Sequence, residues 1–341
     1  MAFSHLGDEL ERELAHADGG MSNDDDTGNT GGRGGRGRGG RRGGGGGGGK
    51  NGARGGRGSR KRKKSDGPAT DKLTSPGNPQ VKALVRLRHR RARDQEGLTI
   101  IEEPMVLRRA WETGYPLQTI FYCNDMLTPP AKELLEDLRA AVAVGQLSVK
   151  MVELTPQLIR KAAYRDTPDG ILAVAPQQRK TLEDLVLGQN AFIMVLENIE
   201  KPGNLGAVLR IADGVGADAV LVTGEGTDLF NPNVLRASRG AFFSTPAVHC
   251  HIGEARDYLH DNGLKVLAST PSADTTYTDA DLTGPMAVVL GCEHDGLSDA
   301  WLKDEGAIAV RIPMEGHSDS LNVSTAAAVL MYEALRQRAS G

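Results

Sequence analysis

The chain has 341 residues, of which 39% are hydrophobic, with three cysteines and a formal net charge of −3. This length and apolar content are enough to bury one or two cores. Cys123, Cys250 and Cys292 lie far apart without a C-x-x-C pair, which excludes a disulfide framework. No apolar run approaches the roughly 20 residues that span a bilayer, and charged residues replace the apolar core of a signal peptide near the start. We therefore expect a cytoplasmic protein without membrane contact.

The net charge averages two opposite parts of the chain. Residues 31–64 hold thirteen of the 41 basic residues and no acidic ones, whereas residues 65–341 hold 27 basic and 36 acidic residues. The basic part is a run of Gly-Arg repeats that includes Arg33, Arg36 and Arg38. Glycine at this density predicts an acidic-then-basic disordered tail over residues 1–75. Its free guanidinium groups favour contact with RNA, although a solubility tail is the alternative.

Short alternating elements predict a small α/β sandwich over residues 78–177. Its first element is a basic helix at 81–93, whose arginines are expected in solvent: Arg86, Arg88, Arg90, Arg91 and Arg93. We interpret the first four as RNA-binding candidates, and a solvated helix face is the alternative. The other predicted strands are 98–101, 119–123, 149–154 and 171–174, and the predicted helices are 103–112, 130–142 and 156–164.

A polar linker at 178–188 leads to a second folded domain at 189–341. Its first strand, 192–196, is continuously apolar, which is typical of a strand buried on both faces. Repeating strand–helix units then predict a parallel sheet, so three polar turns at strand ends should meet in one crevice. The further predicted strands are 219–222, 247–249, 265–268, 286–290 and 307–312, and the predicted helices are 233–238, 253–260 and 325–338.

Two other kinds of site lack their signature in this domain. The turn after the first strand contains G-x-x-G at Gly203 and Gly206, without the G-x-G-x-x-G and distant acidic residue of a dinucleotide site. His249-Cys250-His251 alternates like a metal-binding segment, but no second ligand cluster accompanies it in the sequence. We therefore expect neither a nicotinamide cofactor nor a metal.

Three motifs in a fixed order carry a resemblance to a known family. They are N-x-G-A-x-x-R (Asn204 to Arg210), G-x-E-x-x-G-L-S (Gly291 to Ser298) and I-P-M…S-L-N-V-S (Ile312 to Ser324). Together they resemble the SpoU (TrmH-type) RNA ribose 2′-O-methyltransferases of the SPOUT superfamily. The first folded domain, with Asn78-Pro79-x-Val81-Lys82, is similar to the L30e-like RNA-binding domain that often precedes the catalytic domain. The resemblance covers about residues 78–341.

The resemblance implies a fold, a cofactor and an assembly. The fold would be a parallel-sheet domain whose C-terminal segment is threaded into a deep trefoil knot, a topology that is rare in general. The cofactor would be S-adenosylmethionine, held in the knot by the counterparts of the family's backbone contacts: Gly291, Ile312 and Leu321, with Thr270 as a weaker candidate. The assembly would be a homodimer with the active site at the subunit interface.

The resemblance also implies catalytic residues for methyl transfer to a ribose hydroxyl. Arg210 matches the arginine to which the family assigns catalysis, yet a guanidinium is a poor base at neutral pH. It would either be deprotonated by its surroundings or stay charged and orient the oxygen. The other catalytic candidates, which would orient Arg210 or the ribose through hydrogen bonds, are Asn204, Glu293, Ser320 and Asn322. His294 and His317 lie in the same loops and are not included.

The substrate predicted from this resemblance is structured RNA, with ribosomal RNA favoured by the separate RNA-binding domain and transfer RNA as the alternative. A non-catalytic RNA-binding or ribosome-assembly protein would also explain the basic tail, but it would have no use for Asn204, Arg210, Glu293 and Asn322 together. A knotted methyltransferase that modifies a base is the closer competitor. Mapping of ribose methylation distinguishes these possibilities.

Overall fold

The computed structural model describes residues 71–292 and 294–340. The tail expected at residues 1–75, with Arg33, Arg36 and Arg38, lies outside the described residues except for its last five. None of the described helices is both long and apolar enough to cross a membrane.

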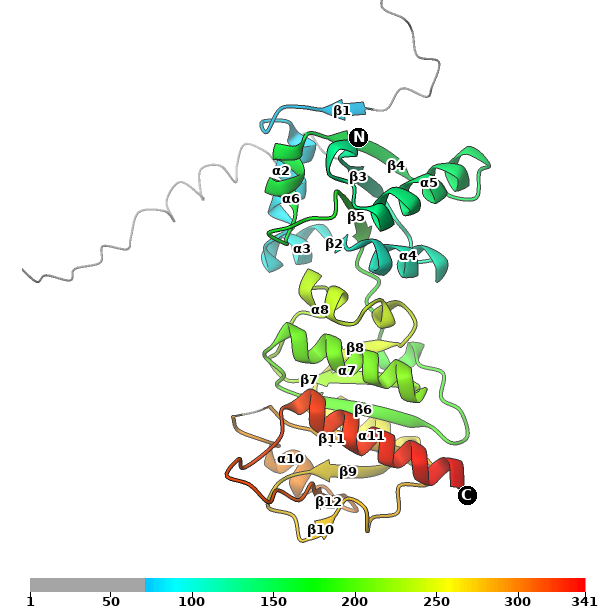
Figure 1. Cartoon of the computed structure of the whole chain (residues 1–341). Coiled ribbons are helices and arrows are strands. Elements are labelled where there is room, and N and C mark those ends of the chain that lie inside the picture. Colours follow the sequence, from blue (N-terminus) through cyan, green and yellow to red (C-terminus); the bar gives the residue numbers. More distant parts are fainter. Residues whose placement is uncertain (1–70, 293, 341) are drawn as a thin grey trace, which may run out of the picture. The chain divides into compact units, whose positions relative to one another are not determined.

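The first folded domain is built on a five-stranded sheet in the order β1–β4–β3–β5–β2 (Figure 1). Its strands are β1 (Asp71–Leu73), β2 (Leu98–Glu102), β3 (Thr119–Tyr122), β4 (Lys150–Leu154) and β5 (Ile171–Pro176). Its helices are α2 (Pro79–Arg86), α3 (Arg90–Glu96), α4 (Pro104–Glu112), η1 (Asn124–Met126), α5 (Pro129–Ala143) and α6 (Pro156–Ala162). β5 runs antiparallel to β3 and β2, and α4 with α5 packs on one face while α2 with α6 packs on the other. The predicted α/β sandwich is confirmed.

The second domain is built on a seven-stranded sheet in the order β10–β12–β9–β11–β6–β7–β8, with every pairing parallel. Its strands are β6 (Phe192–Glu197), β7 (Ala219–Thr223), β8 (Ala247–Cys250), β9 (Lys265–Ser269), β10 (Thr275–Thr276), β11 (Met286–Leu290) and β12 (Ile308–Arg311). Its helices are η2 (Leu182–Asp184), α7 (Pro202–Val215), α8 (Pro232–Ala237), η3 (Ala241–Phe243), α9 (Ile252–Asp261), α10 (Asp299–Leu302) and α11 (Val323–Ser340).

The second sheet separates two cores and confirms the predicted parallel sheet. Residues of α7, α8 and α11 pack on one face with Met194 and Leu196 of β6. Residues of α9 and α10 pack on the other face with Ile193 and Val195. Because successive side chains of β6 point to opposite faces, the whole strand is apolar up to Leu196. α7 and α11 lie side by side on the first of these faces (Figure 1).

One predicted helix is wrong. The basic segment 81–93 is divided into α2 and α3, and Arg93 is 1% exposed instead of pointing into solvent. The Arg93 guanidinium explains the break, because its Nη1 donates to the carbonyls of Leu87 and Arg88. These carbonyls lie at the C-terminal end of α2, where no further helical turn provides N–H donors for them. A side chain from the next helix therefore ends α2.

Two short strands, one short α-helix and the 3-10 helices η1, η2 and η3 were not predicted from the sequence. β1 pairs with β4 inside the range expected to be tail, and β10 pairs with β12 at the edge of the second sheet. α10 is a single turn that begins after Ser298. Elements of two to four residues carry too little periodicity to be recognised, and pairing with a longer strand is what orders β1 and β10.

Candidate functional site: the carboxyl edge of the second sheet

The first motif forms the junction between β6 and α7. Lys201 is the N-cap of α7 and Pro202 fills its first turn, where a missing N–H carries no penalty. Asn204 lies half-buried in this turn, and Arg210 lies exposed further along the helix. The first motif therefore lies at a strand–turn–helix junction.

A hydrogen bond joins the first motif to the third. Asn322 Nδ2 donates to Asn204 Oδ1 at 3.3 Å. Asn322 Oδ1 accepts from the backbone N–H and the hydroxyl of Ser324, at 3.0 and 2.7 Å, and thereby caps the start of α11. Ser320 lies exposed two residues before Asn322. Two segments that are 118 residues apart thus meet at one point, as the parallel sheet predicted.

The second motif is a tight turn after β11. A Cβ atom on Gly291 would lie 2.0 Å from the carbonyl oxygen of Gly296, so only glycine fits there. Gly296 has φ of +68°, and its N–H donates to the Cys292 carbonyl at 3.2 Å. Glu293, the predicted carboxylate of this turn, lies outside the described residues. The backbone of Gly296 and Leu297 therefore packs directly against Gly291 and closes the turn at the edge of the sheet.

A buried carboxylate beneath this turn was not predicted from the sequence. Glu197 ends β6, is fully buried, and accepts from the N–H of Ser298 at 2.8 Å. Its other carboxylate oxygen has no hydrogen-bond partner among the described residues. The signal in the sequence is a charged residue that ends an otherwise apolar strand. Glu197 therefore holds the end of the second motif against the first strand of the domain.

Three of the four candidate cofactor residues follow strands that are neighbours in the sheet. Thr270, Gly291 and Ile312 come directly after β9, β11 and β12, and all three are half-buried. The backbone N–H of Thr270 donates to the carbonyl of Val310 at 2.9 Å, which joins the first of these segments to the third. Leu321, also half-buried, lies next to Asn322. Thr270, Gly291 and Ile312 thus bring three main-chain segments to neighbouring positions at one edge of the sheet, which fits the expectation of a cofactor recognised through main-chain atoms.

The candidate RNA-binding arginines of the first domain differ in their surroundings. Arg86 is half-buried and paired with Glu96 at 3.0 Å. Arg88, Arg90 and Arg91 are exposed, and Arg90 lies 3.6 Å from the carboxylate of Asp94. Three of the four side chains are therefore accessible to a polyanion.

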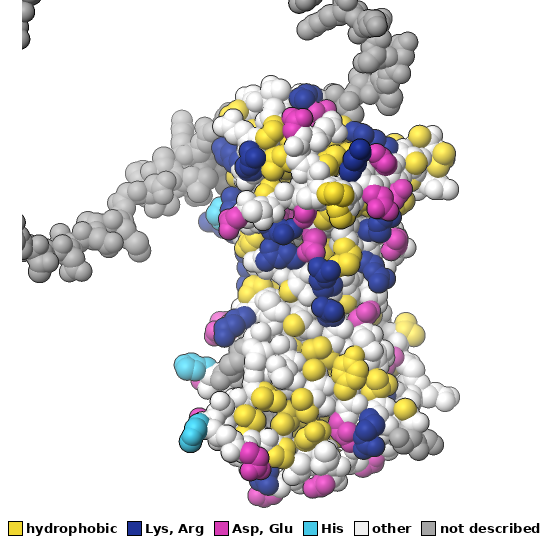
Figure 2. Space-filling view, in the orientation of Figure 1, with side chains coloured by type: hydrophobic (Ala, Val, Ile, Leu, Met, Phe, Trp, Pro, Cys, Tyr) yellow, Lys and Arg dark blue, Asp and Glu magenta, His cyan; other side chains and the backbone are white. Residues whose placement is uncertain are grey.

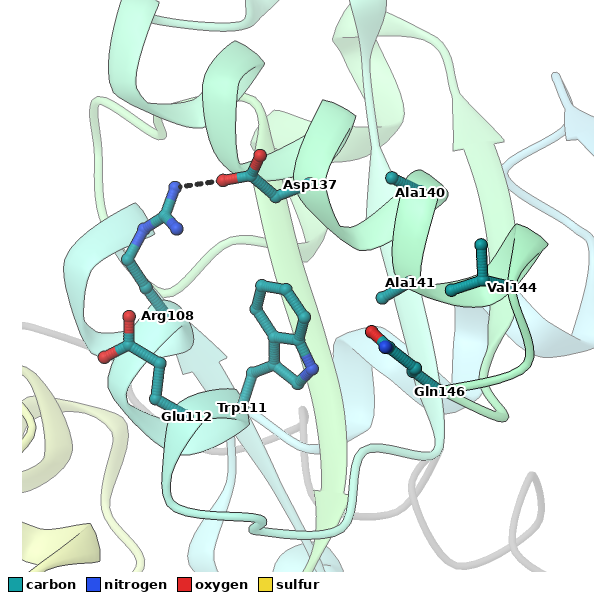
Figure 3. A pocket seen from close by; sticks show the side chains of 8 residues that line it. All are labelled: Arg108, Trp111, Glu112, Asp137, Ala140, Ala141, Val144 and Gln146. Atoms are coloured by element: carbon teal, nitrogen blue, oxygen red, sulfur yellow. Dashed lines mark hydrogen bonds and ion pairs between the residues drawn. The ribbon is translucent and has the colours of Figure 1, made fainter.

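A separate hollow of about 570 Å³ lies between α4 and α5 of the first domain (Figure 3). Trp111 faces into it, and Arg108 is held at its rim by Asp137 at 2.7 Å. None of the predicted site residues lines this hollow. It is therefore distinct from the edge where the motifs meet.

Metal-binding side chains do not gather anywhere in the part of the chain that the structure describes, since no group of three His, Cys, Asp or Glu residues could hold an ion there. His249, which alternates with Cys250 and His251 in the sequence, instead places its Nε2 3.0 Å from the Gly224 carbonyl.

A parallel sheet with three polar turns at its carboxyl edge defines an α/β protein that holds its ligand where those strands end. Comparison with known proteins identifies the family. The model of the SpoU rRNA Methylase family matches residues 191–332, and the model of the MRM3-like substrate binding domain matches residues 78–173. The chain belongs to the SpoU rRNA methylase family.

Several similar proteins are named as RNA methyltransferases. The 23S rRNA (uridine(2479)-2′-O)-methyltransferase of Streptomyces viridochromogenes is 30% identical, over 80% of this chain and 95% of that protein. A crystal structure of an RNA 2′-O ribose methyltransferase is 40% identical, covers 78% of this chain and 98% of its own, and superposes with a TM-score of 0.67. The AdoMet-bound rRNA methyltransferase from Sinorhizobium meliloti is 27% identical with the same coverage and a TM-score of 0.68.

Proposed function

We propose that this protein transfers the methyl group of S-adenosylmethionine to a ribose 2′-hydroxyl of ribosomal RNA. The hydrogen bond between Asn204 and Asn322 carries this proposal, because it brings the first and third motifs together at the edge where the second motif turns. The names of the relatives support both the ribose target and the ribosomal substrate. An AdoMet-bound relative of the same fold supports the cofactor. The expected cytoplasmic location is compatible with a ribosomal substrate.

The cofactor would be held by the backbone of Gly291, Ile312 and Leu321, with Thr270 at the adjoining strand end. When bound, it supplies an electrophilic methyl group on a sulfonium. Transfer requires the ribose oxygen to be held in line with that methyl, about 3 Å away. The residues of this chain therefore contribute mainly by positioning.

Arg210 is proposed to orient the ribose and the neighbouring phosphate as a cation. Its side chain is exposed on α7, and a guanidinium is in general a poor base at neutral pH. Asn204 and Asn322 would fix the ribose through their amide groups, and Ser320 and Glu293 would add hydrogen bonds from the flanking turns. The hydroxyl proton would leave to solvent or to one of these oxygens.

Substitution of Arg210 tests the proposal. Arg210→Ala should abolish ribose methylation of ribosomal RNA, mapped at nucleotide resolution, while the S-adenosylmethionine Kd measured by calorimetry stays within a few-fold. The matched control is Lys303→Ala, which removes an exposed cation 74% accessible to solvent in the same domain. If Arg210→Ala turns over like this control, Arg210 has no part in the reaction. Methylation found only on bases would instead identify a base-modifying enzyme.

RNA binding is proposed for the exposed arginines of the first domain and for the basic tail. Arg88, Arg90 and Arg91, with Arg86 beside them, would contact phosphates, and Arg33, Arg36 and Arg38 would add contacts from the tail. Deletion of residues 1–70 should weaken RNA binding and flatten its dependence on salt, because fewer counterions are released. An unchanged salt slope would show that the tail takes no part in binding.

We also propose that the protein forms a homodimer, that its second domain contains a trefoil knot and that its first domain is L30e-like. Hydrophobic side chains gather over α7 and α11 (Figure 2), where Tyr332 is 51% and Leu335 37% exposed. Such a patch on two adjacent helices favours contact with a second copy. Leu335→Glu should convert the dimer to monomers in sedimentation experiments. If the wild-type protein itself sediments as a monomer, the proposed homodimer is wrong.

A further inference from the structure

A buried ion pair joins the first domain to the second. Arg93 of α3 donates from Nε and Nη2 to one carboxylate oxygen of Asp228, at 3.2 and 2.7 Å. The two side chains are 2% and 6% exposed. Asp228 lies in the β7–α8 loop, which comprises residues 224–231 between these two elements. Neither residue belongs to any of the three sequence motifs.

Both partners are fully committed to this geometry. Arg93 Nη1 donates to the carbonyls of Leu87 and Arg88, at 3.0 Å each. The second oxygen of Asp228 accepts from the N–H of Phe230 at 2.9 Å. A planar guanidinium can satisfy a carboxylate and two carbonyls at once, whereas a lysine ammonium cannot reproduce this fork. The pair therefore fixes the loop against α3 in position as well as in orientation.

The β7–α8 loop in turn holds the turn of the first motif. Thr227 donates through its N–H to the Ile199 carbonyl at 2.8 Å and through its hydroxyl to the Glu200 carbonyl at 2.5 Å. These two residues lie immediately before Lys201, the N-cap of α7. The N–H of Asn204 then donates to the Lys201 carbonyl at 3.0 Å. A continuous series of contacts thus runs from Arg93 to Asn204.

The start of this turn has a backbone conformation that depends on its neighbours. Asn198 has φ of +53°, which is uncommon for a residue with a Cβ atom. Its N–H donates to the Thr223 carbonyl at 2.9 Å, and its side-chain oxygen packs so closely on Gly224 that a Cβ there would lie 2.0 Å away. Such conformations persist when surrounding contacts determine them, and they cluster at functional sites.

Two further contacts reinforce the connection. Arg90 Nη1 donates to the Gly226 carbonyl at 3.3 Å, and the Thr99 hydroxyl donates to the Phe230 carbonyl at 2.7 Å. Arg90 is also one of the arginines proposed above to contact RNA. The helix that would receive RNA is therefore bonded directly to the loop that holds the catalytic turn.

We propose that Arg93, Asp228 and Thr227 are positioning residues, which transmit the placement of RNA on α3 to Asn204 and, through α7, to Arg210. This inference rests on the proposed function and extends it to residues outside the motifs. Since in-line transfer is sensitive to displacements of about 1 Å, loosening this link should slow the chemical step while leaving the binding of either ligand nearly intact. A role in stability alone would lower cofactor affinity together with the rate.

The test uses full-length protein with ribosomal RNA as substrate. Asp228→Asn should lower the single-turnover rate constant at saturating RNA and S-adenosylmethionine about tenfold, as expected for a misplacement smaller than 1 Å. The Kd values for RNA and S-adenosylmethionine should change less than threefold. Thr227→Val, which keeps shape and removes only the hydroxyl bond to Glu200, should give a smaller loss in the same pattern. Thr227→Val also tests the proposal by itself if Asp228→Asn fails to fold.

Asp137→Asn is the matched control, because it breaks the Arg108–Asp137 pair of the first domain (Figure 3), which lies outside this series of contacts. It should leave the rate constant and both Kd values unchanged. Wild-type rates in folded Asp228→Asn and Thr227→Val would overturn the link alone, as would a parallel loss of S-adenosylmethionine affinity. A wild-type protein that methylates no ribose would overturn the proposed function and the link with it.

Discussion

Gly206 of α7 packs directly against α8, and its replacement by alanine tests whether this contact sets the position of the first motif. A Cβ atom there would lie 2.5 Å from the Ala237 side chain, 2.7 Å from the Val234 carbonyl oxygen and 2.9 Å from the Ser238 nitrogen. Two of these three atoms belong to the backbone, so no side-chain rotation can relieve the clash. Gly206→Ala must separate the two helices or distort one of them.

Overpacking of this kind typically costs about 1–3 kcal/mol. Gly203, in the first turn of the same helix, is the internal reference because a Cβ there would meet no atom within 4 Å. Gly203→Ala should be neutral or stabilising by up to about 1 kcal/mol, since alanine restricts the unfolded chain without strain in the folded one. We therefore expect the two variants to differ by about 1–4 kcal/mol in the free energy of unfolding.

Urea titration followed by tryptophan fluorescence measures this difference, because Trp301 is fully buried in the second domain. The methylation rate should fall in Gly206→Ala, since displacement of α7 moves Asn204 and Arg210 together. Gly203→Ala should keep its rate. If Gly206→Ala is no less stable than Gly203→Ala, the close approach of α7 and α8 does not constrain the motif and the reasoning fails.

Three further predictions concern the second motif and two buried titratable groups. Gly291→Ala should weaken S-adenosylmethionine binding at least tenfold in calorimetry, because a Cβ would collide with the Gly296 carbonyl; unchanged affinity would contradict the turn. Burial raises the pKa of Glu102 above its ordinary value of 4.5, so its folded form holds a proton more tightly than the unfolded form. That contribution to stability is lost as the pH rises, so the free energy of unfolding of Glu102→Gln relative to wild type should increase above pH 4.5. A difference in unfolding free energy that does not change with pH would refute this. Burial raises the pKa of Cys250 to about 12, so iodoacetamide at pH 8 should label it in urea but not in the native protein, as mass spectrometry would show.

Local patterns in the sequence predicted most of the long elements. The apolar run of β6, the periodicity of α11 and the strand–helix alternation between them were enough for the parallel sheet, because burial on both faces demands continuous apolar strands. The meeting of Asn204 and Asn322 followed from the same topology, since parallel strands end at one edge. The catalytic roles of Asn204, Arg210, Glu293, Ser320 and Asn322 remain predictions.

Tertiary contacts decided what local patterns could not. Arg93 has the same sequence surroundings as the exposed Arg90 and Arg91, yet it is buried because Asp228, 135 residues away, supplies its counter-charge. Glu197 is buried for a similar reason, since the Ser298 N–H arrives from a distant turn. A charged side chain enters a protein interior only where a partner satisfies it, and the partner of each of these residues lies more than a hundred positions away along the chain. The amino-acid sequence thus determined most of the long strands and helices, while the folded structure decided where the segment 81–93 breaks, which short strands form and which charges are enclosed.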